Sequence, residues 1–203
     1  TPNLAQPQFS DYRALIMIRS TLVLATLWMI TACSSEDIRF DTPAPAGSPE
    51  QVTVAFQRIE VLAVSLPSYA QTEEIYLRDA SGAIVPLGPL WADEPERGLT
   101  LDLVRELRAV TQRLVAPDPW PFRDRADVRV DVRLDVFHAT AAGTFRIEGQ
   151  VFVAPEEAVG RDRARRFEIE VPVGSATNAA SIAAARAAAV RELSVIIARD
   201  GLR

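Results

Sequence analysis

Apolar and polar residues alternate along three consecutive segments in the second half of the chain: 128–138 (VRVDVRLDVFH), 144–153 (TFRIEGQVFV) and 165–173 (RRFEIEVPV). A period of two is typical of β-strands that bury one face and expose the other. Because short loops separate the segments, we expect an antiparallel meander with a solvated outer face. The residues predicted to point inward are Val128, Val130, Val132, Leu134, Val136, Phe145, Ile147, Val151, Val153, Phe167, Ile169, Val171 and Val173.

Extended segments are also predicted in the first half of the chain. Residues 52–67 (VTVAFQRIEVLAVSLP) are rich in β-branched side chains and end at a proline. Residues 73–79 and 82–88 flank the turn sequence Asp-Ala-Ser-Gly, which predicts a β-hairpin.

Two segments have the period of an amphipathic helix. In 98–115, the apolar residues that recur on one side are Leu99, Leu103, Leu107, Val110 and Leu114. The proline-rich PDPWPF at 117–122 must end that helix. Residues 178–199 are rich in alanine, with Asn178 or Thr177 as the cap and Asp200-Gly201 as the stop. The buried stripe predicted for this second helix is Ile182, Ala185, Ala189, Leu193 and Ile196.

These elements together predict a single α+β domain. Its sheet is mainly antiparallel, and two helices pack on the apolar face. Gly149, inside the middle strand of the meander, predicts a bulge or a close approach of a helix rather than a ligand site.

The amino-terminal region has a different character. Residues 22–32 carry no charge and follow Arg19, but eleven residues reach only about half of a ~30 Å hydrocarbon core. This length and the basic flank are typical of a signal peptide. Ile30-Thr31-Ala32-Cys33 resembles a bacterial lipobox, in which the cysteine thiol is acylated after cleavage. The alternative is a stray cysteine after a chance apolar run.

The predicted organisation has three parts. Residues 1–32 form a leader and lipoprotein signal peptide, of which 1–16 precede Met17 and are interpreted as a mis-called start. Residues 33–51 comprise the lipidated Cys33 and a flexible, proline-rich tether. Residues 52–203 form the folded domain.

Composition and charge exclude several classes of function. The chain has 22 basic residues, all arginine, against 27 acidic ones, a net charge of −5, which disfavours nucleic-acid binding. With Cys33 as the only cysteine, no intrachain disulfide can form. Zinc-ligand spacing, a phosphate-binding glycine loop and a G-x-S-x-G motif are all missing from the sequence. We therefore expect no metal, no cofactor and no enzyme activity.

Candidate catalytic side chains have simpler structural interpretations. His138, the only histidine, ends an apolar strand face, where a hydrogen-bonded residue at the edge of the core is expected. Asp131 and Asp135 alternate with arginines, which favours salt bridges on a solvated face over an acid–base pair.

The order of features along the chain resembles the ABC-type transport auxiliary lipoproteins. These proteins combine a lipobox, a short tether, an LP-x-Y step, a strand with isoleucine and arginine, and tryptophan followed by Glu-Pro before the first helix. The matching residues are Leu66, Pro67, Tyr69, Ile75, Arg78, Trp91, Glu94 and Pro95. The departures are one extra residue between Trp91 and Glu94, and a glycine after Arg97. The resemblance covers most of residues 52–200.

The resemblance implies a non-catalytic lipoprotein of a Gram-negative bacterium, anchored in the outer membrane and facing the periplasm. Its implied partners are an MCE-domain tunnel protein and the associated ABC transporter, and it implies a homo-oligomer. Ser34 fits outer-membrane sorting, because aspartate after the lipidated cysteine is the usual inner-membrane retention signal.

Tyr69 and Trp91 have two interpretations: they fill the core, or they form an aromatic patch at a partner interface.

Two other classes of function stay open beside lipid transport. One is a structural or assembly lipoprotein that stabilises another outer-membrane complex, and the weaker one is a secreted enzyme.

The anchoring prediction is tested by Cys33→Ser. We expect this variant to incorporate no labelled palmitate and to accumulate as an unlipidated precursor or a soluble domain, because the thiol is the acylation site. Ser34→Asp should keep the label but shift the protein toward inner-membrane fractions of a sucrose gradient. Palmitate incorporation by Cys33→Ser would contradict the lipoprotein prediction.

Overall fold

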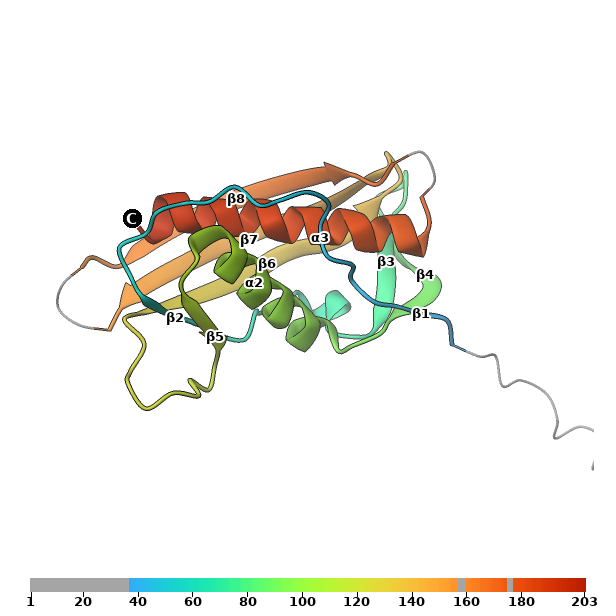
Figure 1. The fold of residues 1–203 in the computed structure, drawn as a ribbon. Helices are drawn as coiled ribbons and strands as arrows, with labels where there is room; N and C mark the ends of the chain where they lie inside the picture. Colours follow the sequence, from blue (N-terminus) through green and yellow to red (C-terminus); the bar gives the residue numbers. More distant parts are fainter. Residues whose placement is uncertain (1–36, 157–159, 175–176) are drawn as a thin grey trace, which may run out of the picture. The chain divides into compact units, whose positions relative to one another are not determined.

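The computed structural model describes residues 37–156, 160–174 and 177–203, and Figure 1 shows an α+β domain in this part of the chain. The predicted signal peptide, Cys33 and Ser34 lie outside the described residues. Among the described residues, no helix has both the length and the apolar composition needed to cross a membrane. The elements in chain order are β1 (Arg39–Phe40), β2 (Arg58–Val61), η2 (Ser68–Ala70), β3 (Glu74–Arg78), β4 (Ile84–Trp91), α2 (Pro95–Thr111), β5 (Leu114–Pro117), β6 (Val128–Thr140), β7 (Thr144–Pro155), β8 (Arg163–Pro172), α3 (Ala179–Ile196) and the π-helical turn η3 (Ile197–Gly201).

The predicted meander is confirmed. β6 pairs antiparallel with β7 from Val128↔Pro155 to Ala139↔Phe145, and β7 pairs antiparallel with β8 along ten residues. The predicted hairpin is also confirmed, since β3 and β4 are antiparallel. These pairings make the sheet mainly antiparallel, as expected.

The other edge of β6 carries parallel partners that the sequence pattern did not predict. β2 pairs with residues 128–130 of β6, and β3 pairs with residues 139–140. β5 adds to β2 in parallel, and β1 adds to β4 in parallel. Only residues 58–61 of the extended segment predicted at 52–67 form a strand. The residues on either side connect this short strand to the rest of the chain.

A β-bulge interrupts β6 between Leu134 and Val136, opposite Gly149. A Cβ at Gly149 would lie 2.0 Å from the carbonyl oxygen of Arg133, so only glycine fits at this crossing. The bulge interpretation of Gly149 is therefore confirmed. Beyond the bulge the inward positions shift by one, so that Phe137 is buried and Val136 is partly exposed. The prediction that Val136 points inward is wrong for this reason.

Both predicted helices are present and lie on the same face of the sheet (Figure 1). α3 is capped by Asn178, as predicted: the Asn178 side chain accepts from the backbone N–H of Ser181, and the Ser181 hydroxyl accepts from the backbone N–H of Asn178. Its last turn continues as η3 through Gly201, so the helical segment includes the two residues predicted to stop it.

α2 ends earlier than the sequence pattern suggests. Gln112 adopts a left-handed conformation with φ of 55°, which closes the helix, and Leu114 begins β5. Leu114 is consequently 38% exposed instead of completing the buried stripe. The other four residues of that stripe are buried between the helix layer and the sheet.

The assignment of the two sheet faces predicts contrasting effects of neighbouring substitutions. Val132 is fully buried, so Val132→Asp places an unpaired charge in the core and should cost several kcal/mol of unfolding free energy. Arg133→Ala, on the outer face, should leave the midpoint of urea unfolding nearly unchanged, because the Arg133 side chain is 62% exposed. Equal losses for the two variants would mean that the faces are assigned wrongly.

Candidate functional site

Residues 38–50, which we call the strap, connect the predicted anchor region to the domain. At its start, β1 pairs in parallel with the end of β4, and Arg39 forms an ion pair of 2.7 Å with Glu73. The backbone N–H groups of Leu90 and Ala92 donate to carbonyl oxygens of the strap. This bound segment differs from the flexible tether predicted for residues 33–51.

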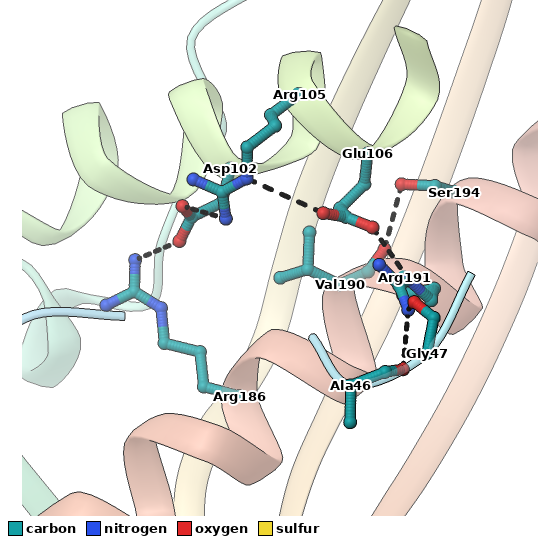
Figure 2. A network of polar contacts seen from close by, with 9 residues as sticks. All are labelled: Ala46, Gly47, Asp102, Arg105, Glu106, Arg186, Val190, Arg191 and Ser194. Carbon is teal, nitrogen blue, oxygen red and sulfur yellow. Dashed lines mark hydrogen bonds and ion pairs between the residues drawn. The ribbon is translucent and has the colours of Figure 1, made fainter. Parts of the chain in front are cut away.

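The second half of the strap is held by arginines of the C-terminal helical segment. The Arg191 guanidinium donates to the carbonyl oxygens of Ala46 and Gly47, both at 2.8 Å (Figure 2). Arg199, in η3, pairs with the Glu50 carboxylate at 2.6 Å. The strap is therefore fixed at both ends, and Figure 1 shows its course along α3.

A chain of ion pairs joins α2 to α3 beneath the strap (Figure 2). Asp102 of α2 accepts from Arg186 of α3 at 3.2 Å and from Arg105 at 2.9 Å. Glu106 accepts from Arg191 at 2.8 Å and lies 3.5 Å from Arg105. Because Arg191 also binds the strap, the two helices and the N-terminal segment share one connected network.

Arg186 and Glu106 are the most enclosed charges of this network, each with 3% of its side chain exposed. The Arg186 guanidinium lies over the Trp91 ring at 4.6 Å from the centroid, a cation–π geometry. Burial lowers the pKa of Arg186, and the nearby Asp102, Asp41 and Asp93 carboxylates offset part of that effect. Burial likewise raises the pKa of Asp102, against the lowering influence of Arg186 and Arg105. Each charge thus depends on its partner to stay ionised away from water.

A cavity of about 160 Å³ adjoins this network. It is lined by Phe40, Asp41, Thr42, Trp91, Ala92, Asp93, Gly98, Leu101, Asp102, Arg105 and Arg186. Acidic and basic side chains nearly balance around it, and its strap residues form one wall. In the part of the chain that the structure describes, no group of acidic, histidine or cysteine side chains is arranged to hold a metal ion. The arrangement fastens the strap to the helices, and the cavity lies where they meet.

The predicted site residues occupy different environments. Trp91 is 2% exposed and packs between Arg186 and Phe137, so it belongs to the core and no exposed aromatic patch includes it. Tyr69 is half-buried, and its hydroxyl accepts from the backbone N–H of Phe137 next to the bulge. Burial raises the pKa of this hydroxyl. His138 is also buried, and its Nδ1 lies 3.0 Å from the Ala139 carbonyl oxygen.

Sequence reasoning missed the ion network, although two signals were present. Arg186 is flanked on each side by three alanines, an isolated charge on an otherwise small and apolar helix face. Asp102 and Glu106 are four residues apart and therefore share one side of α2. The pattern of α2 alone could not reveal that this side faces another helix instead of solvent.

The sequence model of one protein family, described as ABC-type transport auxiliary lipoprotein component, matches residues 39–198. Two solved structures share the fold. One is a crystal structure of an uncharacterized protein, with a TM-score of 0.66 and 20% identity, covering 81% of this chain and 97% of that chain. The other is a DUF330 protein from Xanthomonas campestris, with a TM-score of 0.64 and 19% identity, covering 78% and 91%. No curated protein matches the sequence significantly.

The buried pair predicts non-additive effects on stability. Arg186→Met leaves Asp102 buried with only the half-exposed Arg105, and should cost about 3–5 kcal/mol of unfolding free energy. The double variant Asp102→Leu/Arg186→Met should recover most of this loss, because no unpaired buried charge is left.

Urea unfolding monitored by circular dichroism measures both effects. The matched control is Arg97→Met, which removes an arginine whose side chain is 63% exposed in its pair with Asp93. A loss from Arg186→Met no larger than that of this control would show that the buried pair does not hold the helices together.

Proposed function

Because the chain belongs to the family of ABC-type transport auxiliary lipoprotein components, we propose that it is the outer-membrane-anchored, periplasm-facing subunit of an MCE-type lipid transport system. In this proposal the protein catalyses no reaction. It contacts the MCE tunnel protein that is associated with the ABC transporter. It does so as a homo-oligomer, because a ring of several copies is needed to surround the opening of a tunnel.

The observation that carries the proposal is the family match over residues 39–198, which includes the strap as well as the domain. The lipobox-like Ile30-Thr31-Ala32-Cys33 ends five residues before the matched region begins. One myristoyl-sized chain binds a membrane only marginally, whereas the two or three chains of a lipoprotein hold it almost permanently. A protein so attached is suited to keep a partner at one membrane.

Two features of the described structure support a role in binding a partner at the membrane rather than in catalysis. The strap is fastened first to β4 by β1 and then to α3 and η3 by Arg191 and Arg199, so a load on the predicted anchor would be shared by the sheet and the helical segment. The outer face of β6, β7 and β8 carries ion pairs such as Arg166–Asp135 and Arg146–Glu168, which is typical of a solvated surface.

Co-purification tests the proposal. We expect the full-length lipidated protein, captured from detergent-solubilised membranes, to bring down an MCE-domain protein encoded nearby. Deletion of the gene should increase outer-membrane permeability to a lipophilic dye, and wild-type protein should restore the barrier. The Cys33→Ser variant should fail to restore it, because the domain would no longer be concentrated at the membrane.

The alternative, a structural or assembly lipoprotein, predicts a different result. Capture of envelope assembly factors without an MCE protein, together with unchanged permeability after deletion, would refute the transport role and support that alternative.

A further inference from the structure

An arginine-lined groove lies at the opposite end of the domain from β1. Its volume is about 490 Å³. The walls come from segments far apart in the sequence: residues 55–58 before and in β2, the loop before β6, the end of β7, the start of β8 and the residues at Gly201–Arg203. Figure 1 shows β2 and the C-terminal end of the helical layer together at that end, away from β1. The groove shares no residue with the strap network.

The groove carries an excess of positive charge. Among the described residues, the charged lining residues are Arg58, Arg125, Arg161, Arg163, Arg203, Asp127 and Glu156. Both acids are already engaged: Asp127 pairs with Arg58 at 2.6 Å, and Glu156 pairs with Arg129 at 2.8 Å. The two acidic side chains in the described lining therefore do not neutralise the other four arginines.

Those four arginines have no carboxylate partner among the described residues. Arg163 donates to the backbone carbonyl oxygens of Asp200 and Gly201, which orients its guanidinium without neutralising it. Arg125, Arg161 and Arg203 are exposed. Four guanidinium groups of like charge repel one another, and this gathering occurs in a chain whose net charge is −5. An anion in the groove would relieve that repulsion.

We propose that this groove binds the phosphate group of a small organic phosphate. A guanidinium presents its N–H groups as a planar fork that matches two phosphate oxygens, so arginine is the side chain best suited to phosphate recognition. The volume lies within the range of small-molecule pockets, which favours a compact ligand over the flat acidic surface of a protein partner. Ala55, Phe56, Ala126 and Pro155 supply an apolar wall for the carbon portion of the ligand. This inference does not depend on the proposed transport function.

Isothermal titration calorimetry on the full-length protein in a nonionic detergent tests the inference. The probes are inorganic phosphate, glycerol 3-phosphate and dihexanoyl phosphatidylglycerol. We expect saturable binding that the double variant Arg125→Gln/Arg161→Gln weakens by about tenfold or more, because it removes two charge-assisted hydrogen-bond donors. The matched control Arg133→Gln/Arg166→Gln changes the net charge equally on the outer sheet face and should alter the affinity less than about twofold.

The probes distinguish the sources of the phosphate. Equal affinity for all three supports a site for the phosphate group alone, and tighter binding of the two organic probes supports an organic phosphate with contacts to the apolar wall. Lack of binding to all three, or an equal loss in the control variant, would overturn the inference. A hexaglutamate peptide that binds more tightly than any phosphate probe would also overturn it, in favour of an acidic protein segment.

Discussion

The hydrogen-bonding edges of β6 organise the whole sheet. One edge is filled along most of its length by β7, while the other is divided between β2 at one end and β3 at the other. Between these two short partners, the backbone N–H groups of Leu134 and Phe137 are satisfied by the Ser65 carbonyl oxygen and the Tyr69 hydroxyl. A buried backbone N–H without a partner is costly, so this segment completes the strand edge. The β2–β5 pair and the β1–β4–β3 group therefore belong to one sheet through β6.

The helix layer follows a second constraint, which is the burial of charge. Alanines let α3 lie close to its neighbours, and the isolated Arg186 then has to find a partner away from water. Asp102 provides it, and Trp91 provides an aromatic face. Asp102 and Arg186 belong to different helices, so separating α2 from α3 would cost both side chains a buried ion-pair partner.

Much of the fold follows from local sequence patterns. The alternation in 128–173 predicted three strands and their buried faces, since each face is fixed by a period of two. The same rule failed at Val136, because the bulge opposite Gly149 shifts the period and only the partner strand shows where. The parallel pairing of β2 and β3 with β6 joins residues far apart in the chain, which no local period encodes.

The candidate site was less predictable than the fold. The prolines and polar residues of 38–50 are typical of a tether, yet the main-chain oxygens of Ala46 and Gly47 in this segment are bound by Arg191, about 145 positions away. Because every residue has a backbone carbonyl, the amino-acid type of the accepting residue does not reveal such a hydrogen bond. From the sequence, Trp91 could belong either to the core or to an exposed aromatic patch. In the structure it is buried under Arg186 and belongs to the core.

Binding of the strap to the domain also shortens the free chain between the predicted lipid anchor and the domain. A fully extended tether from Cys33 to the domain boundary expected at residue 52 would span roughly 60 Å, at ~3.3 Å per residue. With β1 bound to β4, only five residues lie between Cys33 and Arg39, and the six steps from one to the other span at most ~20 Å. If Cys33 carries the lipid as we propose, the β1 end of the domain stays close to the bilayer surface. A periplasmic partner would then have to come to the membrane to meet it.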